Sequence, residues 1–448
     1  MPFLAQEHLL IPNKDILSWI FDEQALDQDQ PLAGGFKAIG LEQVCLLSFN
    51  DIYYPMTFLG IVAAGGVFAG VNPSHTSFEF RHAFKIAKVK CLIVEPELLR
   101  NALIAAEACN TPRSRIFILE SWSALQEYGE CDWVRFDDKD TPDNTTAARL
   151  FSCGTTGFPK ALDMSHYNFV AQHILLMGYK ERDYTVIRLL CNPIFHVSIL
   201  PRAHTSPLRG VPPMVVSIIN SPLPMKYSLK SLCNAWSGSA PLGCGLRVRL
   251  KVLEREDAAF NQVWGMSETS CIATMLYYTE QDSTGSLGRC LPNLDAKIVD
   301  EDGRDIIGFG ELCVRGPMIV KGYYENEEAN KRDRDEDGYF PYGRCRVLWY
   351  IVDREKEVTT VRAFQVVPAE LEGVLLSHPD IIGAAGIGIK LASARSFLVM
   401  AHVEERLAKY KRLEGGIKFI DSIPKNASGE ILKNALREQA ARELSAKL

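Results

Sequence analysis

One segment of the chain places glycine, hydroxyl and lysine residues at a spacing that suits phosphate. It reads Phe151-Ser-Cys-Gly-Thr-Thr-Gly-Phe-Pro-Lys160. Backbone N–H groups in such a glycine-rich turn, together with the hydroxyls of Ser152, Thr155 and Thr156, can close around phosphate oxygens. Lys160 would add a compact positive charge. The segment therefore predicts a phosphate site, and the alternative is a glycine–threonine turn with a solvated lysine.

The spacing of the two glycines excludes a Walker A loop. That motif needs four residues between its glycines and a serine or threonine directly after the lysine. Here two residues separate Gly154 from Gly157, and Ala161 follows the lysine. An unrelated P-loop NTPase is therefore a poor interpretation of the segment.

Further segments accompany the phosphate loop in a fixed order along the chain. They are Ser237-Gly-Ser-Ala-Pro-Leu-Gly243, Gln262-Val-Trp-Gly-Met-Ser-Glu268, Gly310-Glu-Leu-Cys-Val-Arg-Gly316, Lys321-Gly-Tyr-Tyr324, Val352-Asp-Arg354, Phe364-Gln-Val-Val-Pro-Ala-Glu-Leu-Glu372 and Pro424-Lys-Asn-Ala-Ser-Gly-Glu430. Together they resemble the signature blocks of the adenylate-forming (AMP-binding) superfamily, which includes acyl-CoA synthetases, 4-coumarate:CoA-ligase-like enzymes, luciferases and peptide-synthetase adenylation domains. The resemblance covers nearly the whole chain, and we assign it by analogy to the acyl-CoA synthetase and 4-coumarate:CoA-ligase-like branch.

The resemblance implies an AMP-forming acyl-CoA ligase for an aryl or a medium- to long-chain carboxylic acid. In that reaction the carboxylate attacks the α-phosphate of Mg–ATP, which gives an acyl-adenylate and pyrophosphate. The thiol of coenzyme A then displaces AMP. The implied cofactors and co-substrates are ATP, Mg²⁺ and coenzyme A, and the small-molecule partner is the carboxylic acid.

The same resemblance assigns roles to individual residues. Residues implied to contact ATP or AMP are Ser152, Gly154, Thr155, Thr156, Gly157, Lys160, Ser239, Ala240, Gln262, Trp264, Ser267 and Arg354. Ser267 would offer a hydroxyl to the α-phosphate, and Glu268 with Thr156 would hold magnesium, which prefers oxygen ligands. The structural alternatives are a packed core residue for Trp264 and a surface residue for Arg354.

Two further sites are implied at the acyl and thiol ends of the reaction. His196, in Pro193-Ile-Phe-His196, and Ser239 would border the acyl pocket, and no acid–base role is expected for the histidine. The alternative for His196 is a hydrogen-bonded histidine of the core. Arg362 would serve the phosphates of coenzyme A.

The catalytic set would be Lys160, Ser267, Glu268 and the position of Glu430, where the family carries a lysine. Loss of one preorganised donor to a transition state typically costs about 2.7–4 kcal/mol. Arg344 also differs from the family pattern. Relatives have an aspartate at this position that accepts hydrogen bonds from the ribose, whereas arginine has no hydrogen-bond acceptor. The alternative interpretation is therefore a degenerate, non-catalytic homologue that folds and binds nucleotide or acid. The chain is also shorter than typical relatives, which implies missing internal segments. Genuine loss from the protein and exons skipped in the gene model are the two explanations.

The amino-acid composition is that of a globular protein and argues against several other classes of protein. The 448 residues are 47% hydrophobic and 23% charged, with a formal charge of −6, and the mean hydropathy is −0.03. These values are typical of globular proteins and give no global electrostatic reason to bind nucleic acid or an anionic membrane. Twelve cysteines without a CxxC pair or a His/Cys cluster predict buried free thiols rather than a zinc site or a disulfide scaffold.

Short apolar runs alternate with helical periods, as in 44–49, 79–86, 90–94 and 98–106, and this alternation predicts an α/β protein. We expect a large N-terminal domain of mixed and parallel sheets with flanking helices over residues 1–352. A small, mobile α+β C-terminal domain would follow over residues 353–448.

Two segments bear on location in the cell. The apolar run Met56–Val71 is shorter than the roughly 20 residues that span a bilayer, and it contains four glycines. It predicts a buried helix that leads into a strand. The last three residues, Ala446-Lys447-Leu448, are a close variant of the SKL address that the peroxisomal import receptor binds. We therefore expect a peroxisomal enzyme, for fatty-acid breakdown or for secondary metabolism.

Overall fold

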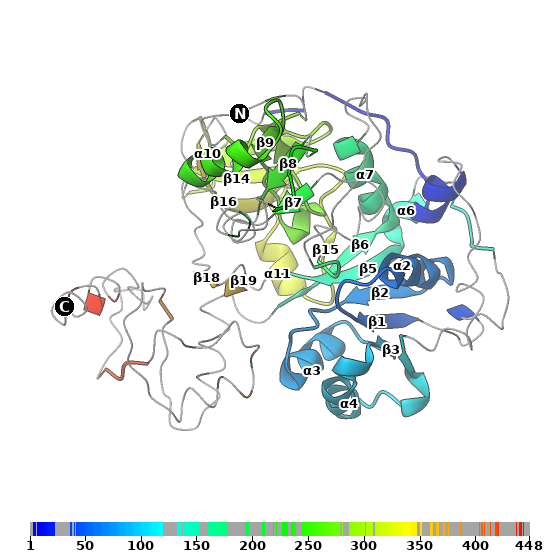
Figure 1. Ribbon diagram of the computed structural model, residues 1–448. Coiled ribbons are helices and arrows are strands. Elements are labelled where there is room, and N and C mark those ends of the chain that lie inside the picture. The colour runs from blue at the N-terminus through cyan, green and yellow to red at the C-terminus, as the bar shows by residue number, and fades with distance from the viewer. Residues whose placement is uncertain are drawn as a thin grey trace.

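The computed structural model describes most of the chain as far as residue 346 and shorter stretches after it (Figure 1). The described residues are 3–5, 7–22, 36–37, 40, 42–119, 132–136, 138, 140–152, 159–177, 193–196, 208–210, 218, 221, 226–231, 234–238, 244–277, 280, 286–300, 302–307, 310–346, 350–351, 359–361, 364–366, 371, 375, 386–387, 403, 405, 407, 413, 417–420, 436, 439–440 and 442. Side-chain statements below exclude residues 177, 208–210, 244–248, 342–346, 350–351, 359–361 and 364–366.

A seven-stranded mixed sheet organises the first part of the chain. Its spatial order is β15-β6-β5-β2-β1-β3-β4. The strands are β1 (Gln43–Leu47), β2 (Val67–Gly70), β3 (Cys91–Val94), β4 (Ile116–Ile118), β5 (Thr146–Phe151), β6 (Ala161–Ser165) and β15 (Gly322–Tyr323). The run β5-β2-β1-β3-β4 is parallel, whereas β6 is antiparallel to both β5 and β15. The phosphate loop lies between the antiparallel strands β5 and β6.

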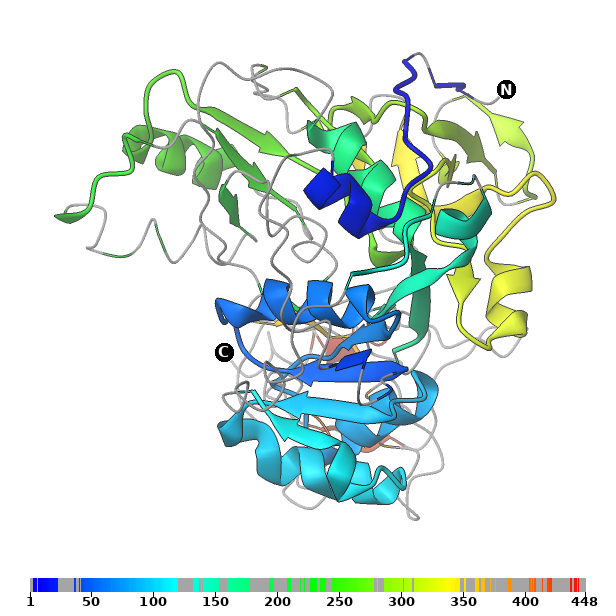
Figure 2. The same ribbon diagram turned by 90° about the vertical axis from the view of Figure 1, so that its right-hand side faces the viewer.

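Helices cover both faces of the parallel strands. Val44 of β1 packs in the same hydrophobic cluster as α2 (Tyr53–Ala63). Cys45, its neighbour on the opposite face, packs in a second cluster with α3 (Ser77–Ile86) and α4 (Leu99–Ala108). Because successive side chains of a strand point to opposite faces, a strand that is covered on both sides is apolar on both, as β1 is from Val44 to Leu47. Figures 1 and 2 show α3 and α4 together beside the edge of the sheet that β3 and β4 form.

Local sequence signals explain the start and the end of α3. Thr76 is its N-cap: the hydroxyl accepts a hydrogen bond from the Glu79 N–H at 3.3 Å, and the Glu79 carboxylate accepts one from the Thr76 N–H at 2.9 Å. This reciprocal arrangement satisfies two N–H groups that a helix leaves unpaired at its start. Lys85 lies in the last turn, where a cation interacts favourably with the helix dipole.

Smaller sheets complete the described part of the chain. An antiparallel five-stranded sheet has the order β13-β12-β14-β16-β17, and a parallel three-stranded sheet has the order β7-β8-β9. The strands of these sheets and of two hairpins are β7 (Leu208–Gly210), β8 (Asn234–Ser237), β9 (Ala259–Gln262), β10 (Thr274–Met275), β11 (Arg289–Cys290), β12 (Asp295–Val299), β13 (Asp305–Ile306), β14 (Gly310–Arg315), β16 (Phe340–Arg346), β17 (Tyr350–Ile351), β18 (Thr359–Val361) and β19 (Phe364–Val366). The remaining helical segments are η1 (Ser18–Asp22), η2 (Pro96–Leu98), η3 (Arg113–Arg115), α6 (Asp140–Asn144), α7 (His166–Met177), α10 (Cys244–Leu253), η5 (Ser267–Thr269) and α11 (Glu327–Arg332).

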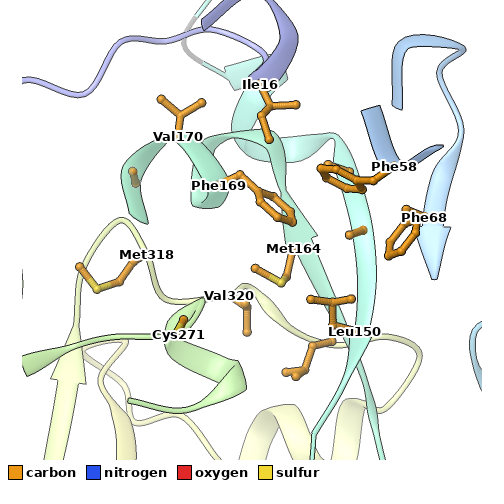
Figure 3. Close-up of a cluster of buried hydrophobic side chains, with 14 of the residues drawn as sticks. Ile16, Phe58, Phe68, Leu150, Met164, Phe169, Val170, Cys271, Met318 and Val320 are labelled. Atoms are coloured by element: carbon orange, nitrogen blue, oxygen red, sulfur yellow. The ribbon is translucent and has the colours of Figure 1, made fainter. Parts of the chain in front are cut away.

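One hydrophobic cluster joins the main sheet to the segments that follow β9 and β14 (Figure 3). The ring of Phe58 from α2 meets Phe68 edge-on at 5.1 Å and packs at 5.5 Å against Phe169 from α7. Figure 3 shows Leu150 of β5 and Val320 on the same side of this cluster. Burial of these side chains therefore fixes β5 and β6, which flank the phosphate loop, relative to residues 271 and 318–320.

The α/β class is confirmed, and so is the interpretation of Met56–Val71, which forms α2 followed by β2. Six cysteines have side chains that the structure describes: none of them forms a disulfide, and four are buried, whereas Cys109 and Cys290 are half-buried. No helix among the described residues is long and apolar enough to cross a bilayer. The predicted boundary at residues 352–353 lies outside the described residues.

Candidate active site

The two residues that flank the phosphate loop, Ser152 and Lys160, are hydrogen-bonded to each other. The Ser152 N–H donates to the Lys160 carbonyl oxygen at 3.0 Å, and the Lys160 N–H donates to the Ser152 hydroxyl at 3.3 Å. Ser152 follows β5 and Lys160 precedes β6, so the ladder between these antiparallel strands continues as far as the loop. The predicted phosphate-contacting residues Gly154, Thr155, Thr156 and Gly157 lie outside the described residues.

The ammonium group of Lys160 lies between an aromatic ring and a carboxylate. Its Nζ is 4.4 Å from the centre of the Tyr323 ring and 3.6 Å from Oδ2 of Asp333. The Lys160 side chain is 18% exposed and that of Asp333 is 9% exposed. A cation over an aromatic face is stabilised by the ring quadrupole, and a buried charge needs a partner of opposite sign. The site therefore holds the lysine charge in place without a ligand.

Tyr323 also contacts Glu268. Its hydroxyl donates a hydrogen bond to Oε1 of Glu268 at 2.9 Å. Burial raises the pKa of Glu268 above its usual value, and the charge of nearby Lys160 partly offsets this effect. Burial also raises the pKa of Tyr323, so the phenol stays protonated and remains a donor. One tyrosine therefore touches both predicted catalytic residues, with its ring face against Lys160 and its hydroxyl on Glu268.

The position of Tyr323 is fixed through its backbone. The Tyr323 N–H donates to Oδ1 of Asn330 at 2.7 Å, and Nδ2 of Asn330 donates back to the Tyr323 carbonyl at 2.8 Å. A Cβ at Gly322 would lie 2.5 Å from the same Asn330 amide, so only glycine permits this close approach. Asn330 belongs to α11, whose C-cap is Asp333, so one short helix supplies both the clamp on Tyr323 and the partner of Lys160.

Glu268 lies in a tight loop that follows β9. A Cβ on Gly265 would lie 1.5 Å from the Cys271 carbonyl oxygen, which leaves room for glycine alone. Ser270 has a left-handed backbone with a φ of 52°, and its hydroxyl donates to the Met318 carbonyl at 2.6 Å. The Val320 N–H donates to the Glu268 carbonyl at 2.9 Å. Two hydrogen bonds therefore tie this loop to the chain that precedes Tyr323.

The other predicted nucleotide contacts in this loop are largely buried. Gln262, Trp264 and Ser267 are 6%, 5% and 7% exposed. Trp264 pairs its backbone with that of Thr274, and its side chain belongs to the large hydrophobic cluster. The structure thus places Trp264 in the core, and its predicted contact with nucleotide stays a prediction. Ser239 and Ala240 lie outside the described residues.

His196 ends a turn that lies beside β2. Its N–H donates to the Pro193 carbonyl at 3.2 Å, and a Cβ on Gly70, the last residue of β2, would be 2.9 Å from the Phe195 carbonyl oxygen. The Ile194 N–H donates to Oδ1 of Asn50 at 2.8 Å. Burial lowers the pKa of His196 to about 4, so its imidazole is neutral at pH 7. The predicted place of His196 at the border of the acyl pocket stays a prediction.

The donor set around Glu268 fits a magnesium ion that is held mainly by phosphate. Oε1 of Glu268 accepts the hydrogen bond from Tyr323, and the Glu268 backbone N–H also donates to this carboxylate. No group of three or more His, Cys, Asp or Glu that could hold a metal lies among the described residues. Mg²⁺ is typically bound through one or two carboxylates together with substrate phosphates, which matches one carboxylate beside a phosphate-binding lysine.

The structure brings together Ser152, Lys160 and Glu268 and leaves several predictions outside its described part. These are the positions of Arg354, Arg362, Glu430 and the side chain of Arg344. Sequence reasoning missed the roles of Tyr323, Asn330 and Asp333. The segment Lys321-Gly-Tyr-Tyr324 was the available signal for the tyrosine, because it matched a family block. No pattern pointed to Asp333.

Known proteins resemble this chain over nearly its whole length. Residues 23–201 and 200–324 match the family model described as AMP-binding enzyme. Acyl-CoA ligase azaF of Aspergillus niger is 40% identical over 97% of this chain and its own full length, and phenylacetyl-CoA ligase epaB of the same species is 39% identical over 99% and its full length. The alignment with azaF extends over 531 positions, more than the 448 residues here, so azaF has segments that this chain lacks.

Solved structures agree with these sequence relationships at the level of the fold. The o-succinylbenzoate CoA synthetase MenE from Bacillus subtilis has a TM-score of 0.73 at 21% identity, covering 91% of this chain and 92% of that one. ATP-bound MatB from Rhodopseudomonas palustris has a TM-score of 0.63 at 24% identity, covering 95% and 98%. The chain belongs to the AMP-binding enzyme family, in its acyl-CoA ligase branch.

Proposed function

We propose that this acyl-CoA ligase activates an aryl or a medium- to long-chain carboxylic acid with Mg–ATP, and that an arylalkanoic acid is its preferred substrate. In the first step a carboxylate oxygen bonds to the α-phosphorus and pyrophosphate leaves. In the second step the sulfur of coenzyme A bonds to the acyl carbon, AMP leaves, and the thiol proton is released. The observation that carries the proposal is the shared contact of Tyr323 with Lys160 and Glu268.

Lys160 and Ser152 would hold the β- and γ-phosphates at the mouth of the phosphate loop. The Lys160 ammonium is already largely removed from water and lies in a fixed position. A preorganised cation stabilises charge on the departing pyrophosphate without first having to reorient, which is the usual source of electrostatic catalysis. Thr155, Thr156 and the loop glycines would complete this cradle, in line with the sequence prediction.

Glu268 would hold the magnesium ion beside those phosphates, with Thr156 as the second predicted ligand. The ion would neutralise the leaving pyrophosphate when bound. Tyr323 keeps the Glu268 carboxylate in one orientation through its hydrogen bond to Oε1. Ser267, directly before Glu268, would offer its hydroxyl to the α-phosphate, and Arg354, Ser239, Ala240 and Gln262 would contact the nucleoside.

The acyl end of the site favours an uncharged substrate body. The turn 193–196 presents Phe195 and a neutral His196, whose pKa of about 4 keeps it uncharged in a neutral medium. The relative named phenylacetyl-CoA ligase, at 39% identity, supports an aryl acid as the first choice. Arg362 is the proposed contact for the phosphates of coenzyme A.

Carboxylate-dependent exchange of pyrophosphate into ATP tests this proposal directly. We expect the unaltered chain to catalyse exchange with phenylacetate and more weakly with decanoate. Lys160→Ala should abolish exchange, because it removes the phosphate cation. Glu430→Lys should increase the rate about 10²–10³-fold if the family lysine is needed, since one such donor is worth that much.

The outcomes of this assay distinguish an active ligase from a degenerate, non-catalytic homologue. Exchange by the unaltered protein supports the ligase and shows that Glu430 is tolerated. If Glu430→Lys catalyses exchange and the unaltered protein does not, the site is built for adenylation but is inactive in its natural form. This outcome supports the interpretation as a degenerate, non-catalytic homologue. Silence in both proteins, although ATP binds, would overturn the proposed reaction.

Peroxisomal localisation is a further part of the proposal. It is supported by the sequence Ala446-Lys447-Leu448, which lies outside the described residues, and its proposed partner is the peroxisomal import receptor.

A further inference from the structure

A basic cavity lies along the outer face of α3. Its volume is about 980 Å³, which lies within the range of small-molecule sites. Residues before β1, β3 and β4 form one part of its wall, at the amino-terminal edge of these parallel strands, and α3 forms another part. His82 of α3, which lines the cavity, also contacts the Pro159 carbonyl through Nε2 at 3.0 Å. Ser152 and Lys160, in contrast, lie at the carboxyl end of β5, and none of Lys160, Glu268 or Tyr323 lines the cavity.

The charges that line this cavity are strongly biased toward one sign. Among the described residues, five cations face a single lining carboxylate, that of Glu42. The cations are Arg81, Lys85, Lys88, Lys90 and Arg115. The chain as a whole carries a formal charge of −6, so the positive charge of the cavity lining is opposite in sign to the net charge of the chain. A concave surface lined by one sign of charge concentrates ions of the opposite sign.

Two of these cations have no counter-charge within the described residues. Lys90 pairs with Glu42 at 3.2 Å, and Lys88 pairs with Glu325. Arg81 and Lys85, one turn apart on the exposed face of α3, form no ion pair with any carboxylate that the structure describes. Like charges at this spacing on a helix repel each other. A bound anion would remove that repulsion.

The kind of anion follows from the donors. The guanidinium groups of Arg81 and Arg115 present forked N–H donors that match phosphate oxygens, and Lys85 adds a mobile point charge. The hydroxyl of Thr111, also in the wall, is buried and forms no hydrogen bond within the described residues. Several cations around one cavity select a ligand with several negative charges over a single carboxylate.

We propose that this cavity binds a ligand that carries two or more linked phosphate groups, at a site separate from the proposed catalytic centre. Arg81 and Lys85 would contact the phosphates, and Arg115 would close the far side. The proposal does not depend on ligase activity, because it concerns a different set of residues.

The test uses inorganic tripolyphosphate as the probe and the full chain as the protein. Titration calorimetry in 0.15 M NaCl gives the dissociation constant, under conditions where charges more than about 8 Å apart are screened. Hydrogen exchange of the same samples localises the ligand. We expect protection in residues 81–91 and 108–115. The double variant Arg81→Glu, Lys85→Glu should bind at this site at least about tenfold more weakly, a difference of about 1.4 kcal/mol.

A matched control changes the net charge equally at another place. Arg304→Glu, Lys331→Glu reverses one arginine and one lysine on exposed surface outside the cavity. The proposal holds if the control binds like the unaltered chain and keeps the protection pattern. Equal weakening in both double variants would show that only net charge matters, and it would overturn the proposal. Protection confined to residues 159–163, or no binding at all, would overturn it as well.

Discussion

Tyr323 accounts at the residue scale for the meeting of two predicted catalytic groups from distant parts of the chain. Its ring face holds the Lys160 ammonium at 4.4 Å, and its hydroxyl donates to Glu268 at 2.9 Å. Asp333 balances the lysine charge from the other side at 3.6 Å. We therefore regard Tyr323 as a positioning residue, because it orients the metal-binding candidate Glu268.

The change Tyr323→Phe tests this role. It keeps the ring over Lys160 and removes only the hydrogen bond to Glu268. Hydrogen bonds to charged groups are worth about 1.5–3 kcal/mol, so the exchange rate at subsaturating magnesium should fall about 10–100-fold. The apparent affinity for Mn²⁺, measured by electron paramagnetic resonance in the presence of a non-hydrolysable ATP analogue, should fall in parallel.

Tyr324→Phe is the matched control for Tyr323→Phe. Tyr324 is the next residue, and its ring lies 3.5 Å from the Arg149 guanidinium instead of beside Lys160. We expect its metal affinity and magnesium requirement to match those of the unaltered protein. If Tyr323→Phe lowers thermal stability but leaves Mn²⁺ affinity unchanged, the tyrosine is structural only and the positioning role is wrong.

His166 gives the protein a stability that depends on pH. Its Nδ1 accepts a hydrogen bond from the Ile16 N–H at 3.3 Å, and burial lowers its pKa to about 4. An unfolded histidine titrates near 6.5, so between these values the unfolded state binds more protons. The contribution of His166 to the free energy of unfolding is therefore fully present above pH 6.5. This contribution, on the order of 3 kcal/mol, is lost as the pH falls toward 4.

His166→Asn isolates this contribution, because the asparagine Oδ1 can accept the same hydrogen bond and does not titrate. The difference in unfolding free energy between the two proteins, measured by urea denaturation at pH 7 and pH 5, should shrink or reverse at the lower pH. Glu254 acts in the opposite direction, since burial raises its pKa to about 7, but it is present in both proteins and cancels. A constant difference would contradict the assignment.

At the scale of elements, the backbone conformation of the loop from Gly265 to Cys271 determines the position of Glu268. The loop turns so sharply that a Cβ on Gly265 would overlap the Cys271 carbonyl oxygen at 1.5 Å. Ser270 adopts the left-handed conformation that allows this turn, and its side chain is anchored to Met318. The catalytic candidate is therefore placed by a backbone path that only glycine at position 265 allows.

Gly265→Ala should displace this loop. Overpacking typically costs about 1–3 kcal/mol, and a contact this short, against backbone, belongs at the upper end. We expect a lower melting temperature together with loss of Mn²⁺ binding. Gly303→Ala is the control, because nothing lies within 4 Å of a Cβ there and its cost comes from the backbone angle alone. Normal metal binding by Gly265→Ala would contradict the proposed link between loop shape and site.

The elements that the sequence predicted well are those with a strong local signal. The runs at 44–49, 79–86, 90–94 and 98–106 became β1, α3, β3 and α4 within a few residues. Apolar periodicity reports burial directly, so it locates such elements. The pairing of β12, β14 and β16 was not predicted, because antiparallel order depends on contacts between strands that are distant in sequence.

The same reason limits how much of the site the sequence predicted. Glycine, hydroxyl and lysine residues gave the phosphate loop a local signature, and the resemblance added Glu268. Asp333 had no signature, since a surface-type residue at the end of a short helix acquires its role only when α11 packs beside Lys160. Tyr323 lay in a recognised block, but its two contacts come from tertiary packing.

At the scale of the whole molecule, one packed unit connects the main sheet, the loop of Glu268 and the strand of Tyr323 (Figure 3). A further, smaller cluster joins Leu371, Val403 and Leu407, and Phe78 of α3 packs against it. Phe78 also lines the basic cavity. A ligand in that cavity would therefore lie next to the contact between α3 and the later part of the chain.

Localisation is the prediction that belongs to the whole chain. The residues Ala446-Lys447-Leu448 are a close variant of the SKL address that the peroxisomal import receptor binds. A fluorescent protein fused to the N-terminus should therefore be imported and appear in puncta that coincide with a peroxisomal marker. Leu448→Glu places a charge where the receptor needs an apolar side chain, so this fusion should be diffuse, whereas Glu443→Gln should behave like the unaltered chain. Diffuse signal from the unaltered fusion would show that the tripeptide is not an import signal, while the ligase chemistry, which depends on Lys160 and Glu268, would be unaffected.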